Sequence, residues 1–205
     1  MNPATSHSLA EAWQEVQAFA PVHTIQTEEQ HRQAERALDT LLELVGHDIP
    51  PTARVGDLTL VLNGAGFRQK LFSRVYVCAL YLPKRTRDAS AILDSDRPWQ
   101  VAMHFMRNID HHDVLQAFMD SFERDPLRQS PQSEAELEKF HVVLDDLKKG
   151  QDLTIRYVPG VGTTLHSPTA NSSTVPGREF ANAILRTWLG SNPVDPQLKD
   201  KMLGM

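Results

Sequence analysis

The sequence predicts an α+β protein with an antiparallel or mixed sheet that helices cover on one face. Runs rich in β-branched and apolar residues, typical of strands, occupy residues 58–82, 99–106 and 153–166. Segments with apolar residues three and four positions apart, typical of helices, lie around them. The two kinds of segment do not alternate strictly, so a doubly wound parallel sheet fits less well.

The size and charge of the chain limit the kinds of protein it can be. With 205 residues it is long enough for one sizeable core but short for two full domains. We therefore expect one domain over residues 55–205 and a helical extension over residues 1–54. A formal net charge of -5 and a pI near 6.0 argue against a nucleic-acid partner, because a phosphate-binding surface needs excess Lys and Arg on one face.

The sequence also predicts a cytoplasmic protein. Cys78 is the single cysteine, so no internal disulfide can form. The first residues carry no basic patch followed by an apolar stretch, which an export signal would require. No window approaches an uninterrupted apolar run of about 18 residues, so we expect no membrane span.

Two helices are expected before the sheet. Residues 9–19 place Trp13, Val16 and Phe19 on one helical face, and residues 27–45 begin with a capping box. An apolar helical face of this kind must pack on another apolar surface. The extension is therefore a candidate for self-association into a homo-oligomer.

The first strands are expected at residues 58–62 and 67–82, joined by a turn at the glycine-containing residues 63–66. Pro83 ends the second strand because it has no N–H to donate to a ladder. A further strand is expected over residues 99–106.

Helices are expected over residues 89–93, over residues 114–122 after a cap at Asp110, and from the capping box at residue 133 to residue 147.

A hairpin is expected near the carboxyl end. Residues 153–158 and 163–166 flank Pro159-Gly160, a pair that suits the central positions of a type II turn. Residues 167–176 are expected to form a polar loop. A helix over residues 180–188 and a short tail helix close the chain.

Five segments in order along the chain resemble the chalcone isomerase-like family, as found in its bacterial members. They are Leu62-Asn63-Gly64-Ala65-Gly66-Phe67-Arg68, Val75-Tyr76-Val77-Cys78-Ala79-Leu80-Tyr81-Leu82-Pro83, Tyr157-Val158-Pro159-Gly160-Val161-Gly162-Thr163, Pro176-Gly177-Arg178-Glu179-Phe180 and Trp188-Leu189-Gly190. The resemblance implies an open-faced β-sandwich, a large antiparallel sheet with helices layered on one face. It has no counterpart for the residues before Val55.

The resemblance also implies a role for Arg68, which matches an arginine in the family's ligand cleft. In plant isomerases this arginine holds the oxyanion of a chalcone, while a water held by hydroxyl side chains polarises the ketone. In fatty-acid-binding relatives it takes a carboxylate, and the alkyl chain enters an apolar pocket. Tyr76 stands where the plant isomerases have a threonine, which puts the catalytic role in doubt.

Physical reasoning supports an anion site at Arg68, because a guanidinium stays charged and presents paired donors that fit a carboxylate. If residues 67–82 form one strand, Arg68, Phe72 and Tyr76 share a face. We therefore expect Arg68, Tyr76 and Phe72 to bind the ligand, with hydroxyls from Ser173 and Thr174. Arg68 and Tyr76 would be catalytic only in an isomerase. The plainer alternative is an Arg68 whose stem packs on the sheet and whose head is solvated or paired.

No metal or cofactor is expected. The cluster at residues 110–113 holds His111 and His112, but adjacent histidines should point in different directions, and they lack the i, i+4 spacing of a helical metal site. Gly160-Val161-Gly162 lacks the third glycine of a dinucleotide-binding loop.

Three functional hypotheses follow. The first is a non-catalytic binder of a small amphipathic carboxylate, such as a fatty acid. The second is an isomerase, an intramolecular lyase acting on a chalcone-like substrate. The third is an interaction module that uses the amino-terminal helices.

Overall fold

A computed structural model of the protein describes residues 49–70, 73–123, 135–139, 144–169 and 172–205. Contacts divide the chain into two units, Met1–Ile49 and Pro50–Met205, and the description below concerns the second. The two predicted amino-terminal helices and Phe72 lie outside the described residues, so what was expected of them stays a prediction.

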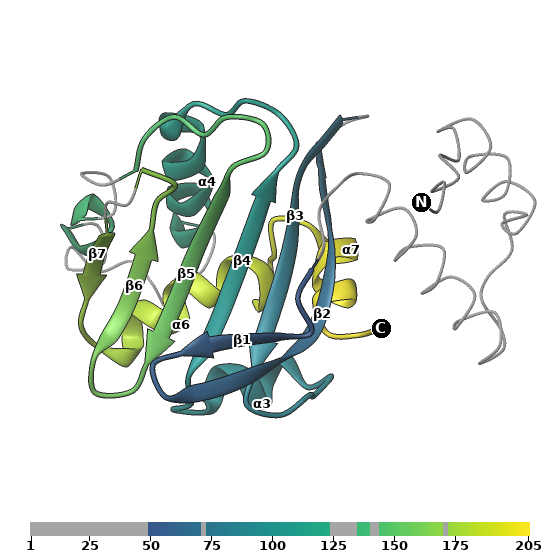
Figure 1. Ribbon diagram of the computed structural model, residues 1–205, viewed down its shortest axis with the longest axis vertical. Helices are drawn as coiled ribbons and strands as arrows, with labels where there is room; N and C mark the ends of the chain where they lie inside the picture. Colours follow the sequence, from purple (N-terminus) through teal and green to yellow (C-terminus); the bar gives the residue numbers. More distant parts are fainter. Residues whose placement is uncertain (1–48, 71–72, 124–134, 140–143, 170–171) are drawn as a thin grey trace, which may run out of the picture. The chain divides into compact units, whose positions relative to one another are not determined.

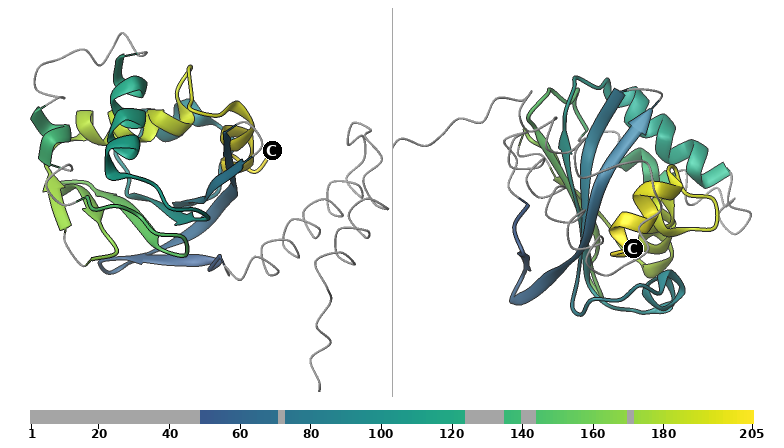
Figure 2. Two further views of the ribbon diagram at one scale, coloured as in Figure 1. Left: turned by 90° about the horizontal axis from the view of Figure 1, so that it is seen from above. Right: turned by 90° about the vertical axis from the view of Figure 1, so that its right-hand side faces the viewer.

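The domain is built on one seven-stranded antiparallel sheet in which each strand pairs with the next along the chain (Figure 1). The strands are β1 (Thr52–Val55), β2 (Leu58–Lys70), β3 (Ser73–Leu82), β4 (Trp99–Phe105), β5 (Asp152–Val158), β6 (Gly162–His166) and β7 (Ser172–Val175). The helices are α3 (Ala89–Asp94), α4 (His111–Glu123), α6 (Arg178–Leu189) and α7 (Pro196–Met202), and residues 135–139 are also helical. Helices α4 and α6 lie over the same face of the sheet (Figure 2). The predicted α+β, open-faced architecture is confirmed.

The alternation of side chains along β3 produces two buried layers. Cys78 and Leu80 belong to the main core between the sheet and the helices. Val77, Ala79 and Tyr81 are equally buried but lie outside that core, on the opposite face, because successive side chains of a strand point to opposite sides. Strand β1 crosses this second face (Figures 1 and 2) and contributes to its burial.

The glycine-containing residues 63–66 do not form the expected turn. They lie inside β2, where the pairing register with β3 shifts between Leu62 and Gly64, which is the mark of a bulge. The glycines are needed for another reason. A Cβ on Gly64 would lie 2.1 Å from the carbonyl oxygen of Lys201 in α7, and one on Gly66 would lie 2.7 Å from the Lys201 Cβ. These positions thus let α7 pack directly on the strand.

The run over residues 67–82 is a hairpin rather than one strand. Strand β2 ends at Lys70 and β3 begins at Ser73, with Arg68 paired to Tyr76 across the ladder.

Three other segments differ from expectation. Residues 52–55, which carry no strand prediction, pair as β1 with β2. The helix expected to reach residue 147 does not, because Leu147 pairs with Ile109 in an isolated β-bridge. The segment expected as a polar loop over residues 167–176 contains β7, which pairs antiparallel with β6.

None of the helices among the described residues is long and apolar enough to cross a membrane.

Candidate ligand cavity

A cavity of about 340 Å³ lies between the sheet and the helices. Strands β2, β3 and β4 form its floor, and α4 and α6 contribute its walls. Most of its lining is apolar and includes Val75, Met103, Phe105, Val114, Phe118 and Trp188. Arg68, Tyr76 and Thr187 also line it, and charged or polar residues complete the lining: Lys70, Arg107, Asp113, Gln116 and Asp120. Sites that hold small molecules usually combine an apolar lining with polar groups that fix the orientation of the ligand.

Arg68 and Tyr76 share a face of the sheet, but not for the reason expected. They are cross-strand partners in the β2–β3 hairpin, and directly opposite residues of an antiparallel pair point to the same side. Because of the bulge in β2, Gly64, Gly66 and Arg68 all alternate onto the face that α7 covers.

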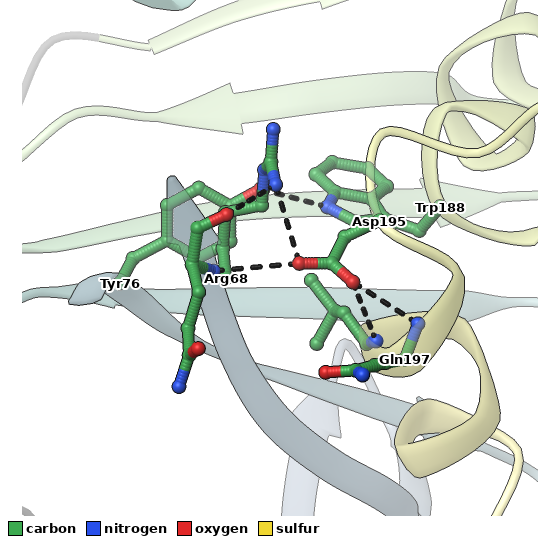
Figure 3. Close-up of polar contacts among 7 residues, drawn as sticks. Arg68, Tyr76, Trp188, Asp195 and Gln197 are labelled. Atoms are coloured by element: carbon green, nitrogen blue, oxygen red, sulfur yellow. Dashed lines mark hydrogen bonds and ion pairs between the residues drawn. The ribbon is translucent and has the colours of Figure 1, made fainter. Parts of the chain in front are cut away.

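The guanidinium of Arg68 is already paired within the protein. Its Nη1 lies 3.2 Å from Oδ2 of Asp195, and it also donates to the backbone oxygen of Gln69 (Figure 3). The backbone N–H of Gln69 points to the same Asp195 oxygen at 3.4 Å. The side chain of Arg68 is 25% exposed and that of Asp195 is 13% exposed, so the pair is partly shielded from water. Arg68 is therefore both ion-paired and cavity-lining.

Asp195 is held by the start of α7. Its other oxygen, Oδ1, accepts hydrogen bonds from the backbone N–H groups of Gln197 (3.0 Å) and Leu198 (3.2 Å), so Asp195 is the N-cap of the helix. Pro196 occupies the first helical position, where a missing N–H costs nothing. The carboxylate thus fixes the helix start and faces Arg68 at the same time.

Tyr76 is placed to donate a hydrogen bond into the cavity. Nε1 of Trp188 lies 3.2 Å from the Tyr76 hydroxyl, and an indole N–H can only donate, so the hydroxyl oxygen is the acceptor (Figure 3). Burial, followed by the nearby Cys78, raises the pKa of Tyr76 well above its usual value, so the phenol keeps its proton. Within the described part of the chain, no acceptor takes that proton.

One further polar group at the cavity is unsatisfied. Oγ1 of Thr187 is buried and has no hydrogen-bond partner among the described residues, and Thr187 belongs to the cavity lining. Buried hydroxyls are usually paired. Cys78, in contrast, is a core residue: it is fully buried, and burial raises the pKa of its thiol.

Two of the predicted ligand residues lie elsewhere. Ser173 and Thr174 belong to β7, and strands β3 to β6 separate β7 from β2. They do not line the cavity, and Oγ1 of Thr174 lies 2.9 Å from Oγ1 of Thr164 on the neighbouring strand. The structure therefore brings together Arg68 and Tyr76, but not the two hydroxyl residues.

The histidine pair at the start of α4 does not diverge as its adjacent positions in the sequence predict. The ring centroids of His111 and His112 are 4.4 Å apart. Asp110, His111 and His112 each offer one atom that could bind a metal, and these atoms lie within 4.8 Å of one another. Several of these atoms are already engaged, since Asp110 accepts from the His112 N–H at 2.8 Å, and Nδ1 of His111 lies 2.8 Å from Oδ1 of Asp146. The hydrogen bond to Asp146 raises the pKa of His111 and lowers that of Asp146. The absence of a metal stays a prediction.

Three residues at the site, Asp195, Trp188 and Thr187, were not expected there from the sequence. A local signal existed for Asp195, because Asp followed by Pro is typical of a helix start. A second signal concerned the face of the strand that carries Arg68. Gly64, Gly66 and Arg68 are two residues apart, a spacing that places all three on one face of a strand.

The fold and the cavity together define an open-faced β-sandwich protein with an arginine at a mainly apolar pocket. The chain belongs to the chalcone isomerase-like family, whose model matches residues 41–204. Among solved structures, it is similar to a fatty-acid binding protein of Arabidopsis thaliana, with a TM-score of 0.61 and 16% sequence identity over 78% of this chain and 93% of that one. No curated protein matches the sequence.

Proposed function

We propose that this protein binds a small amphipathic carboxylate, such as a fatty acid, without catalysing a reaction on it. The observation that carries the proposal is that Arg68 and Tyr76 both line one mainly apolar cavity of about 340 Å³. The similar Arabidopsis protein, described as fatty-acid binding, supports the same ligand class.

The headgroup would lie at Arg68 and Tyr76. Only Nη1 of the guanidinium has hydrogen-bond partners among the described residues, so its other N–H groups are available to a ligand oxygen. Tyr76 would add a second hydrogen bond, because its pKa keeps it protonated and its own acceptor oxygen is taken by Trp188. Hydrogen bonds to a charged group contribute about 1.5 to 3 kcal/mol each when shielded from water.

The alkyl chain would occupy the apolar part between β4 and α4, where Phe105, Val114 and Phe118 form the lining. Each methylene moved out of water contributes about 0.8 kcal/mol. A cavity of about 340 Å³ lies at the small end of the range for ligand pockets. It therefore favours short or medium chains over long ones.

Extraction under denaturing conditions followed by mass spectrometry tests for a bound carboxylate. Titration of the delipidated protein with dodecanoate then compares the wild type with Arg68→Met, which keeps the apolar stem but removes the charge. We expect at least a tenfold loss of affinity, the factor that corresponds to about 1.4 kcal/mol. Arg74→Met is the matched control, because the Arg74 guanidinium lies 4.3 Å from the Phe67 ring and not in the cavity lining. Equal affinities in wild type and Arg68→Met would refute the proposal.

An isomerase acting on a chalcone-like substrate is the second candidate. The same pair of donors, Arg68 and Tyr76, can stabilise a developing oxyanion. Thr187, whose hydroxyl has no partner among the described residues, belongs to the same cavity lining. A spectrophotometric assay decides between the two functions. Chalcone absorbance that falls no faster than in buffer removes the isomerase.

Self-association through the amino-terminal extension and a cytoplasmic location complete the proposal. Strand β1 begins at Thr52, so a truncation that starts at Pro50 leaves the sheet intact. If the extension joins copies of the chain, light scattering should give a lower particle mass for the truncated protein than for the full chain. The decrease should exceed the mass of the removed residues. The one cysteine is buried, which gives no reason to place the domain in an oxidising compartment.

A further inference from the structure

The charge of Arg68 is compensated before any ligand arrives. Oδ2 of Asp195 lies 3.2 Å from Nη1 of Arg68, so the carboxylate forms a neutral pair with a guanidinium whose residue lines the cavity. A ligand carboxylate that binds the remaining N–H groups of Arg68 must therefore lie close to a second negative charge. Two carboxylates around one guanidinium repel each other, and the partial shielding of this pair from water strengthens the repulsion.

Asp195 cannot move away without cost. Among the described residues, four hydrogen bonds hold its side chain: two from the backbone N–H groups at the start of α7, one from the Gln69 N–H and one from Arg68. The helix itself is anchored on β2, because Gly64 and Gly66 let its backbone approach the strand. The carboxylate is thus a fixed part of the headgroup site.

The other charges in the lining do not restore an excess of positive charge. Lys70 and Arg107 carry two positive charges, and Asp113 and Asp120 carry two negative ones. Lys70 and Arg107 are exposed, so water and salt screen them. Asp195 remains the anion in direct contact with the Arg68 guanidinium.

We propose that Asp195 is a specificity-determining residue that reduces the preference of this site for carboxylates over uncharged polar headgroups. The inference rests on the proposed ligand-binding function. With Asp195 in place, the site offers hydrogen bonds from Arg68 and Tyr76 but little net charge. The affinity of the site for a long-chain alcohol or amide is then closer to its affinity for a carboxylate of the same length. At an unpaired arginine the difference between these two affinities would be larger.

The test compares dodecanoate with dodecanol at neutral pH in wild type and Asp195→Asn. Asparagine caps a helix as well as aspartate does, so α7 is retained while the charge is removed. We expect the ratio of dodecanoate affinity to dodecanol affinity to rise by roughly tenfold, as suits the loss of a partly exposed charge interaction. Asp195→Ser, a second capping residue without charge, should shift the ratio in the same direction. Asp200→Asn, the same substitution at an exposed position of α7, should leave it unchanged.

The outcomes separate this inference from the function on which it rests. If wild type binds dodecanoate and Arg68→Met does not, but the ratio is unchanged in Asp195→Asn, then Asp195 is only a helix cap and the inference is wrong. A lower ratio in Asp195→Asn also overturns it, because Asp195 would then orient Arg68 for the ligand rather than oppose the ligand charge. If neither wild type nor any variant binds dodecanoate or dodecanol, the proposed function itself fails.

Discussion

The backbone of Gly64 in β2 passes beneath Lys201 of α7 at a distance that excludes any side chain. A Cβ on Gly64 would lie 2.1 Å from the Lys201 carbonyl oxygen and 2.8 Å from that of Met202. Both neighbours are backbone atoms, which cannot rotate out of the way. The nearby Asn63 strengthens the contact, because its Nδ2 donates to the Met202 oxygen at 2.8 Å. The position of α7, and with it the position of Asp195, depends on this glycine.

Gly64→Ala should therefore destabilise the domain by about 3 kcal/mol, the upper part of the usual range for overpacking. The measurement is urea denaturation at equilibrium. Gly160→Asn serves as the control, because Gly160 has φ +78 in the β5–β6 turn and open space around it, and asparagine tolerates that conformation. The control should stay within about 0.5 kcal/mol of wild type. Similar losses in both variants would show that the close approach of α7 is not what requires Gly64.

Tyr76→Phe tests the hydroxyl at the cavity. It removes the acceptor of the Trp188 N–H, and an unpaired buried donor costs about 1 to 3 kcal/mol of stability. Dodecanoate affinity should also fall, by roughly fivefold to tenfold, because one hydrogen bond to the headgroup is lost. Isothermal titration calorimetry and denaturation measure the two effects separately.

The matched control for that substitution is Tyr157→Phe. The Tyr157 hydroxyl donates to Asp96 at 2.6 Å, and Tyr157 does not line the cavity. Its removal should reduce stability and leave dodecanoate affinity unchanged. A loss of affinity in both variants would assign the effect to general loosening of the fold instead of to the Tyr76 hydroxyl.

The sequence predicted most of the sheet because the periodicity of its strands is local. Strands β4, β5 and β6 and helices α4 and α6 carry clear two-residue or helical patterns, and they lie where those patterns indicate. The β2–β3 hairpin was missed because Leu71 and Phe72, between the two strands, carry no Gly, Pro, Asn or Asp signal for a turn. Strand β7 was missed because Ser and Thr in sequence are as typical of loops as of an edge strand.

The candidate site was predictable only in part. Arg68 was identified from a family resemblance and Tyr76 from the alternation of side chains along an expected strand, and both line the cavity as cross-strand partners. Asp195 and Trp188 reach them from more than a hundred residues further along the chain, through helix packing that no local pattern encodes. The glycines of β2 were attributed to a turn, because a close approach of two backbones leaves the same sequence signal as a turn does.

The ion pair between His111 and Asp146 should make stability depend on pH. The folded-state pKa of His111 lies above its usual value of 6.5, so its contribution is complete below that value and is lost as the pH rises through the folded pKa. The folded-state pKa of Asp146 lies below 3.8, so its contribution is present above that value and is lost as the pH falls through the folded pKa. The pair therefore stabilises the fold most between about pH 4 and 6.5.

Denaturation of wild type and His111→Gln at pH 5.5 and pH 8.5 checks this prediction. The stability difference between the two proteins should be larger at pH 5.5. Asp146→Asn should show the same pattern, and the double variant should lose no more than either single variant, because the substitutions remove one shared interaction. A difference that does not change with pH would mean that His111 contributes through packing alone.

The length of the bound chain should follow the volume of the cavity. For a series of fatty acids, affinity should rise by about fourfold for each methylene, the factor that corresponds to 0.8 kcal/mol, until the cavity is full. Val114 of α4 lines the cavity, so Val114→Phe should reduce the free volume and shift the optimum toward shorter chains. Val161→Phe, at a turn position that is 58% exposed, should leave the optimum unchanged. An optimum that does not move in Val114→Phe would mean that the chain leaves the headgroup site by another route.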